Sequence, residues 1–329
     1  MAGRGVGVGV GWILAAPPSK ENGGAKHCSA HGLVAYGAGS SVVVMEARSM
    51  QLVAVLPMPA LKSAPLQPAP FVTAVQWTPE VLPRDLTQDF STAHLQLAAG
   101  DRQGRIAIWD VASGDACTWL ELESEKGRQG IQDLCWVHGH PWLLAAIHGP
   151  TLVTIWNPAT RNSIWKFDSG SELLGCVRSD PFDHRQLCVV GLKGLLLSIL
   201  VGGVLDAEIH MKHYLIPGQE EKGAMVTGEK EKTKDGTPVA GSTSAGAPAL
   251  AASPGVIVGC LYSTTRRGLL YVMMPREIVV FDLAFGMVLS STALPRGCAK
   301  LLDFLAVVDG DILYCAHQDG KLSAWNRKE

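Results

Sequence analysis

The sequence of 329 residues predicts an all-β fold built from six similar units, and three observations support this prediction. Short apolar stretches alternate with turn residues along most of the chain, as expected for many short strands. One stretch, residues 95–110, contains two such strands around a turn. The same pattern recurs along the chain, and recurrence at a near-constant interval indicates a repeat architecture.

The hairpin of residues 95–110 is the clearest copy of this pattern. Residues 95–99 form its first expected strand, and Gly100 to Gly104 supply a turn in which glycine can adopt positive φ. The second strand is rich in β-branched and aromatic residues and ends at Trp109 and Asp110. This Trp-Asp dipeptide marks the third strand of a WD-repeat blade, so the sequence predicts a WD-repeat β-propeller.

Five further stretches repeat this hairpin, and three of them replace the tryptophan with another apolar residue. The six marker positions are Met45, Trp109, Trp156, Ile199, Phe281 and Trp325. Three of the five intervals, 47, 43 and 44 residues, lie near the ~40–45 residue period of such blades. We therefore predict six four-stranded units. We expect their ring to be incomplete, because the sequence ends just after the third strand of unit six.

The remaining stretches define the predicted domain limits. Residues 1–27 form an irregular, glycine-rich N-terminus, residues 28–217 hold units one to four, and residues 256–329 hold units five and six. Residues 218–255 contain charged runs followed by Gly, Ser, Thr, Ala and Pro. They have too few large apolar residues to offset the entropy of ordering. We predict a disordered insertion between blades, which accounts for most of the longest interval.

Composition argues against several functional classes. The formal net charge of −2 argues against general binding to nucleic acid or anionic membranes. The eight cysteines form no Cys-x-x-Cys pair and several lie in apolar strands, which favours reduced thiols in the cytoplasm. Residues 187–205 are the most apolar stretch, but Lys193 and Gly194 divide them. We therefore expect two buried strands there rather than a membrane-spanning helix.

No group of residues predicts catalysis, a metal or a cofactor. The Gly-Val run of residues 5–11 lacks the flanking strand and helix that a dinucleotide-binding loop requires. Two clusters of Cys and His, around Cys28 and around Cys135, do not have the spacing of a four-ligand zinc site. The sequence therefore predicts a non-enzymatic protein with no cofactor.

One polar position has an expected structural role. Asp319 lies six residues before Trp325, in the predicted turn, where an aspartate commonly supports a buried hydrogen-bond network in WD repeats. The equivalent positions before Trp109 and Trp156 are Gln103 and Pro150. We therefore expect this network in only some of the units.

Several stretches resemble the N-terminal propeller of the WD repeat-containing protein 11 family. They are residues 33–37, 42–44, 131–133 and 144–148, then Asp180-Pro181-Phe182-Asp183, and Pro275-Arg276-Glu277 with Ile278, Asp282 and Leu283. They occur in order across nearly the whole chain. The last two motifs are not general features of WD repeats, which makes the resemblance more specific.

The resemblance implies a scaffold for protein–protein interaction at the trans-Golgi network, where it would help to capture endosome-derived vesicles. The implied partners are golgins and subunits of vesicle-tethering complexes, and the implied membrane association is peripheral, through partners. The implied location is the cytoplasm, at the trans-Golgi network and vesicles, with the nucleus as an alternative. A WD-repeat adaptor in ciliary or Hedgehog signalling, nuclear assembly or ubiquitin-ligase substrate reception is the alternative function, because fold does not decide between them.

Overall fold

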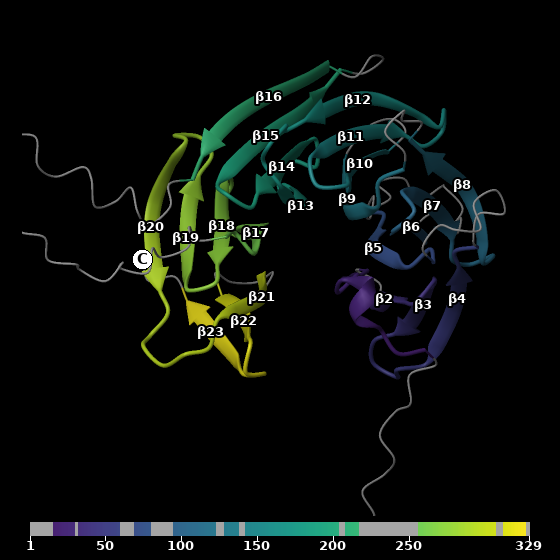
Figure 1. The fold of residues 1–329 in the computed structure, drawn as a ribbon, viewed down its shortest axis with the longest axis horizontal. Helices are drawn as coiled ribbons and strands as arrows, with labels where there is room; N and C mark the ends of the chain where they lie inside the picture. Colours follow the sequence, from purple (N-terminus) through teal and green to yellow (C-terminus); the bar gives the residue numbers. More distant parts are fainter. Residues whose placement is uncertain are drawn as a thin grey trace, which may run out of the picture. The chain divides into compact units, whose positions relative to one another are not determined.

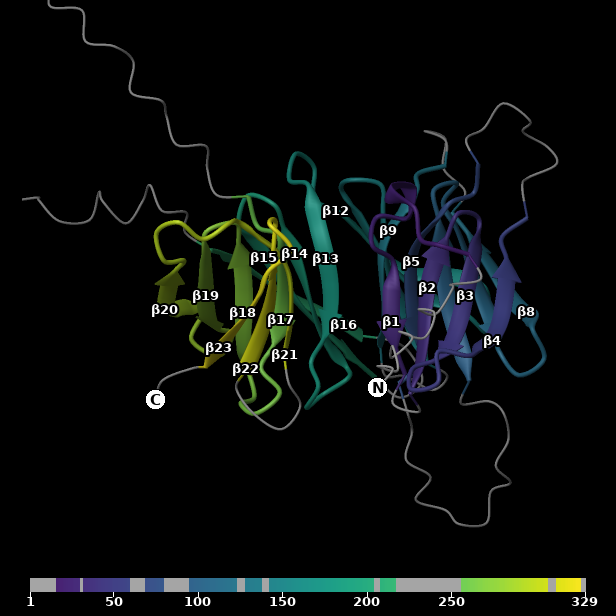
Figure 2. The same ribbon diagram turned by 90° about the horizontal axis from the view of Figure 1, so that it is seen from below.

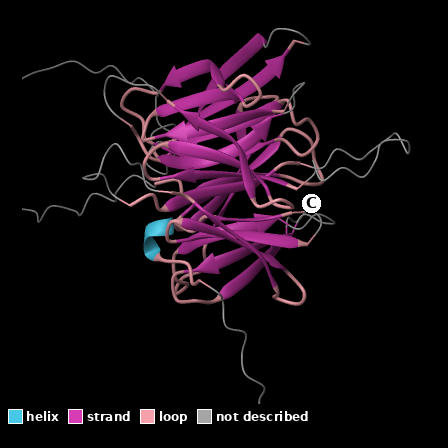
Figure 3. Cartoon of the chain, turned by 90° about the vertical axis from the view of Figure 1, so that its right-hand side faces the viewer, coloured by secondary structure: helices cyan, strands magenta, loops and turns pink. Residues whose placement is uncertain are grey.

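The computed structural model describes residues 16–29, 32–59, 69–79, 95–122, 128–137, 142–203, 208–216, 256–306 and 312–326. Within these ranges the regular structure consists of β-strands and one short 3₁₀ helix, η1 (Lys20–Asn22) (Figure 3). No helix in these ranges is long and apolar enough to cross a membrane. The predicted all-β class is confirmed.

The strands form six successive sheets, and the first three contain four strands each (Figure 1). Sheet one is β1 (Lys26–Cys28), β2 (Leu33–Ala38), β3 (Ser41–Glu46) and β4 (Leu52–Pro57). Sheet two is β5 (Val72–Trp77), β6 (Gln96–Asp101), β7 (Arg105–Asp110) and β8 (Asp115–Glu121). Sheet three is β9 (Ile131–Val137), β10 (Leu143–His148), β11 (Leu152–Asn157) and β12 (Asn162–Asp168).

The other three sheets continue this order along the chain. Sheet four is β13 (Leu174–Ser179), β14 (Gln186–Gly191), β15 (Leu195–Gly202) and β16 (Glu208–Leu215). Sheet five is β17 (Gly259–Tyr262), β18 (Leu269–Met274), β19 (Glu277–Asp282) and β20 (Met287–Ala293). Sheet six is β21 (Leu301–Ala306), β22 (Ile312–His317) and β23 (Leu322–Asn326). Sheet six therefore has three strands within the described residues, as expected for a unit whose sequence ends just after its third strand.

In every sheet, strands that are consecutive in the chain are also neighbours in the sheet. The hairpin predicted at residues 95–110 is β6–β7, in which Leu97 lies opposite Trp109. Its first strand extends to Asp101, two residues beyond the prediction, so the turn is shorter than expected. Gly104 closes that turn at φ 82°, and a Cβ there would lie 2.5 Å from the Gln129 carbonyl oxygen. Only glycine fits both the conformation and the space.

A β-bulge recurs where the third strand pairs with the fourth. The register shifts immediately before Met45, Trp109, Trp156 and Phe281, the marker residues of four sheets. A bulge leaves one residue of the outer strand unpaired and increases the local twist. The unpaired residues at these shifts are Val53, Cys117, Ile164 and Leu289.

The chain divides into two compact units, residues 1–189 with 197–212, and residues 190–196 with 213–329. In the first unit, one apolar core around Trp77 and Leu97 joins sheets one and two, and a second around Trp136 and Leu144 joins sheets two and three. In the second unit, a core that includes Tyr271 joins sheet five to sheet six. Figure 2 shows the strands of these two sheets, in green and yellow, next to one another.

Backbone hydrogen bonds also join successive sheets. At four junctions, the turn between the second and third strands accepts a hydrogen bond from an N–H at the start of the next sheet. These donor–acceptor pairs are Val72 to Gly39 (2.9 Å), Leu174 to Pro150 (2.7 Å), Ile257 to Leu192 (2.8 Å) and Leu301 to Pro275 (2.9 Å). Between sheets two and three the backbones approach so closely that a Cβ on Gly130 would lie 2.8 Å from the Arg102 carbonyl oxygen. Each hydrogen bond contributes about 0.5–1.5 kcal/mol net.

Candidate interaction surface

All six marker residues lie in the third strand of their sheets. Met45, Trp109, Trp156, Ile199 and Phe281 are buried, and Trp325 is partly buried. Trp109 packs edge-on against Trp119, with ring centroids 6.2 Å apart. Trp109 and Trp156 belong to cores that join neighbouring sheets, and Trp325 packs against the core that joins sheets five and six. The five buried markers cannot be reached by a partner.

Asp110 shapes the turn that follows its strand. Its Oδ1 accepts hydrogen bonds from the backbone N–H groups of Ala112 (2.9 Å) and Ser113 (3.3 Å). Asn157 and Asp282 make the same pair of bonds at the corresponding turns. This short polar side chain is placed to fix a turn, as Asx residues commonly do.

The expected buried network before Trp325 does exist, but Asp319 is not part of it. His317 Nε2 lies 2.6 Å from Ser323 Oγ, and the Trp325 indole N–H donates to the same oxygen (2.7 Å). His317 Nδ1 lies 2.9 Å from the Ala299 carbonyl oxygen. Asp319 instead forms an exposed ion pair with Lys321 (2.9 Å), which lowers the pKa of its carboxyl group. The turn projects into solvent, so its aspartate cannot reach the buried groups.

Sheet three contains a related pair. The Trp156 indole N–H donates to Nε2 of His148 (3.3 Å), and both side chains are buried. Burial disfavours the charged imidazolium, and with a smaller contribution from Lys166 it lowers the pKa of His148 to about 4. His148 is therefore a neutral acceptor that satisfies the tryptophan.

Sheet two has a buried ion pair at the same place. Both oxygens of Asp101 bind Arg105: Oδ2 accepts from Nε (2.8 Å) and pairs with Nη2 (2.7 Å), and Oδ1 accepts from the backbone N–H (2.9 Å). The guanidinium also lies 5.3 Å from the ring centroid of Trp119. Sequence reasoning missed this pair. The feature that could have revealed it is the position in the strand. Asp101, His148 and His317 are each the last residue of the second strand of a sheet.

A second polar group lies on the first strands of three sheets in the first unit. Asp133 on β9 forms an ion pair with Arg178 on β13 and accepts the Val177 backbone N–H (2.9 Å). His27 on β1 accepts the Trp77 backbone N–H at Nδ1 (3.2 Å). Burial lowers the pKa of His27 to about 4, and the positive charge of Arg178 acts in the same direction. These bonds join neighbouring sheets, which indicates a structural role.

Within the described ranges, no cluster of three or more His, Cys, Asp or Glu side chains is arranged to hold a metal ion. Of the Cys and His clusters around Cys28 and Cys135, three members, His31, His138 and His140, lie outside the described residues. Cys28 is exposed and Cys135 is buried. Burial raises the pKa of the Cys135 thiol to about 11, so this thiol stays protonated at neutral pH.

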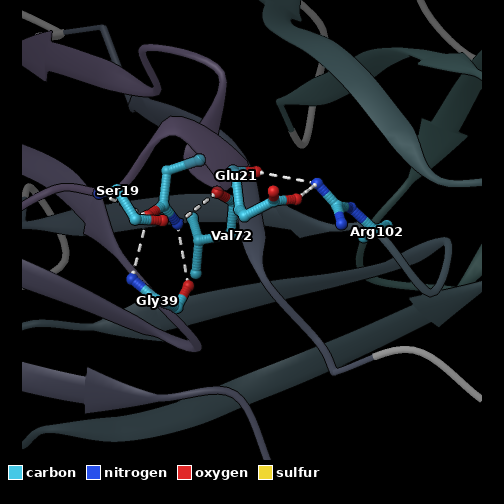
Figure 4. A network of polar contacts seen from close by, with 6 residues as sticks. Ser19, Glu21, Gly39, Val72 and Arg102 are labelled. Carbon is cyan, nitrogen blue, oxygen red and sulfur yellow. Dashed lines mark hydrogen bonds and ion pairs between the residues drawn. The ribbon is translucent and has the colours of Figure 1, made fainter.

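The segment around η1 ties the N-terminal residues to two sheets (Figure 4). The side-chain amide of Asn22 donates to the carbonyl oxygens of Gly39 and Val72, both at 2.8 Å, and its Oδ1 accepts the Gly39 backbone N–H at 2.9 Å. Glu21 forms an ion pair with Arg102 in the β6–β7 turn. The region that the sequence predicted as irregular up to residue 27 therefore contains η1 and the first two residues of β1.

The first family-like motif forms the turn between β13 and β14. The carboxylate of Asp180 is buried and accepts the Phe182 backbone N–H (2.8 Å), while Asp183 pairs with Arg185 (2.7 Å). Pro181 completes the turn. Phe182 remains 45% exposed on this fixed turn. It is the member of the motif that a partner can contact with a large apolar surface.

The second family-like motif joins sheets five and six. Pro275 and Arg276 form the β18–β19 turn, and Arg276 Nη1 donates to the Cys298 carbonyl oxygen (2.8 Å). Glu277 is buried in β19 and accepts a hydrogen bond from Ser291 Oγ (2.6 Å). The motif therefore fixes the path of the chain from one sheet to the next.

Residues 16–329 match the model of the family described as WDR11 first beta-propeller. The chain belongs to the WDR11 first β-propeller family. It is 25% identical over 307 residues to WD repeat-containing protein 11 of Danio rerio and 26% identical over 314 residues to that of Homo sapiens. Each alignment covers 88% of this chain, and the chain spans 23% of the length of each relative.

The fold of this WDR11-family chain also resembles a chain in a solved structure entitled "Crystal Structure of Mitotic Checkpoint Complex". The TM-score is 0.60 at 14% sequence identity, covering 93% of this chain and 73% of that chain. This similarity supports the fold. The family-like motifs quoted above thus occur in a chain whose six-unit organisation and family are both established.

Proposed function

We propose that this chain is a non-enzymatic scaffold for protein–protein interaction that acts in the capture of endosome-derived vesicles at the trans-Golgi network. The observation that carries the proposal is its membership of the WDR11 first β-propeller family over residues 16–329. The polar groups described above also support it. The ion pairs and histidines on the strands hold sheets and turns together, which leaves apolar side chains at turns and edges for partners.

The proposed partners are golgins and subunits of vesicle-tethering complexes, with the protein located in the cytoplasm and peripheral to the membrane. Phe182 is the residue we assign to partner contact. It lies on a turn fixed by the Asp180 carboxylate, so little conformational entropy is lost when a partner covers the ring. Aromatic anchors on rigid supports commonly contribute a large share of binding energy.

Proximity labelling of proteins near the 329-residue chain fused to a biotin ligase tests this proposal. We expect labelling of trans-Golgi golgins and tethering subunits, and we expect Phe182→Ser to reduce that labelling several-fold. Leu173→Ser is the control, because Leu173 is a large apolar residue of similar exposure (42%) that lies outside the motif. Predominant labelling of nuclear or ubiquitin-ligase proteins would overturn the proposal in favour of the alternative adaptor role.

A further inference from the structure

The turn between β19 and β20 departs from an otherwise repeated design. The corresponding turns in sheets one, two and three carry Ser49, Ser113 and Thr160 at their fourth position. Each of these hydroxyl groups forms a hydrogen bond inside its own turn. In sheet five the fourth position is Phe285, whose side chain is 79% exposed. A large aromatic residue thus stands in solvent where the three other turns compared carry a small polar residue.

The turn that carries Phe285 is held firmly. Asp282 Oδ1 accepts the backbone N–H groups of Ala284 (2.8 Å) and Phe285 (3.2 Å). Tyr214, near the end of β16, donates its hydroxyl to the Leu283 carbonyl oxygen (3.0 Å) and packs edge-on against Phe281. The exposed ring is therefore presented on a rigid support, as expected for an interface anchor.

The strand that follows this turn is an edge strand without charge. β20 is the last strand of sheet five, and no Asp, Glu, Lys or Arg occurs from residue 283 to residue 295. Charged residues are present on the corresponding strands β8, β12 and β16. Natural proteins use charges, particularly lysine, to keep edge strands from pairing with other chains. β20 has no such protection and also exposes Met287 and Leu289.

We propose that β20 pairs with β20 of a second copy of this chain and so forms a two-fold homodimer. A two-fold interface places the same surface of both subunits in contact. A charged edge strand would therefore lie against the same charges of the second copy. β20 carries none, so no like-charge repulsion opposes the pairing. Residues 290–293 lie beyond the bulge at Leu289 and pair regularly with β19. Their outer edge can therefore continue the sheet into the second copy.

β4 is the competing edge strand, because it is also uncharged and exposes Leu52, Val53 and Val55. Its preceding turn has the charged Arg48 where the β20 turn has Ala284, and it carries Ser49 in place of an aromatic residue. β4 therefore lacks the anchor that distinguishes β20. Val53 provides a matched control, since it occupies the same bulge position as Leu289 and is 48% exposed, against 46% for Leu289.

Sedimentation velocity of the 329-residue chain over a wide concentration range tests the dimer. We expect a monomer–dimer equilibrium that is weakened roughly tenfold or more by Phe285→Ser, the residue type that the other turns carry. The double variant Leu289→Lys/Thr292→Lys should be monomeric. Val53→Lys should dimerise like the parent chain. Circular dichroism melting curves identify any variant that fails to fold. If the double-lysine variant does not fold, Phe285→Ser still tests the dimer.

Three results would overturn the proposal. The first is a folded parent chain that stays monomeric at every concentration, which would leave the patch for another protein or for no partner. The second is a dimer that persists in the folded double-lysine variant or in Phe285→Ser. The third is equal weakening by Val53→Lys and by the double-lysine variant, because it would indicate that β4 pairs with β20. The proposal does not depend on the trans-Golgi function.

Discussion

The buried histidine of sheet three provides a quantitative test of the packing described above. The pKa of His148 falls from its ordinary value of 6.5 to about 4 in the folded chain, chiefly because burial disfavours the charged ring. The folded-state pKa is thus lower than the unfolded-state pKa. The neutral ring is compatible with the fold above pH 6.5, and stability is lost as the pH falls from 6.5 towards 4.

The size of this effect follows from the two pKa values. Lowering the pH from 7 to 5 should reduce the free energy of unfolding by about 2 kcal/mol through His148 alone. Other groups titrate over the same range, and His27 contributes in the same direction because its pKa is also lowered to about 4. Comparing the parent chain with His148→Gln isolates the contribution of His148, since the other groups titrate in both proteins. Glutamine also offers the Trp156 indole N–H a neutral acceptor.

Urea unfolding at pH 7, 6 and 5, followed by tryptophan fluorescence, measures these free energies by linear extrapolation. We expect the parent chain to lose about 2 kcal/mol more than His148→Gln between pH 7 and pH 5. His210→Gln is the control, because His210 is an exposed histidine on β16, and its pH dependence should follow that of the parent. Equal pH dependence of the parent and His148→Gln would refute the assignment of His148 as a buried neutral acceptor.

Three further predictions concern stability. Asp101→Asn should cost about 3–5 kcal/mol in urea unfolding because it leaves Arg105 buried and unpaired, whereas Glu121→Gln, at the more exposed pair with Arg128, should cost less than about 1 kcal/mol; equal costs would contradict this comparison. Trp109→Ala should lower stability by about 3–5 kcal/mol, and a variant with unchanged melting temperature would show that this tryptophan is not a core residue. Replacing residues 218–255 with a short Gly/Ser linker should leave the melting temperature nearly unchanged, because loop-closure cost grows slowly with length; a large decrease would count against the predicted disorder.

The six hairpins could be predicted because their signal is local. Each hairpin combines an apolar third strand with a turn. Residues 187–205 could be assigned to two strands because Lys193 and Gly194 interrupt the apolar stretch. The structure has β14 and β15 there, with the turn at the predicted place. The predicted insertion at residues 218–255 lies outside the described residues and stays a prediction.

The polar partners of the tryptophans could not be predicted in the same way. His317 and Ser323 are six residues apart on adjacent strands, and only the strand register shows that they share a hydrogen bond. Asp319 lies between them in the sequence but points to solvent, so the commonly expected position misled the prediction. The Asp101–Arg105 pair could not be predicted from the commonly expected position, because that position is the turn residue Gln103 and the acidic partner is the last residue of the preceding strand.

Phe285 shows what comparison among units can add. On its own, an exposed phenylalanine in a turn has little meaning, because single exposed apolar residues are common. Its significance comes from the three equivalent turns, which carry Ser or Thr at the same position. The alignment of those turns requires the strand pairing and the bulge positions, neither of which is explicit in the sequence.

The most direct test of the proposed scaffold role is a relocation assay in cells. The 329-residue chain is fused to a mitochondrial outer-membrane anchor, and endogenous trans-Golgi proteins are located by fluorescence microscopy. We expect golgins or tethering subunits to move to mitochondria, and we expect Phe182→Ser to reduce this recruitment while Leu173→Ser does not. Failure of a folded, mitochondrially anchored chain to recruit any trans-Golgi protein would contradict it.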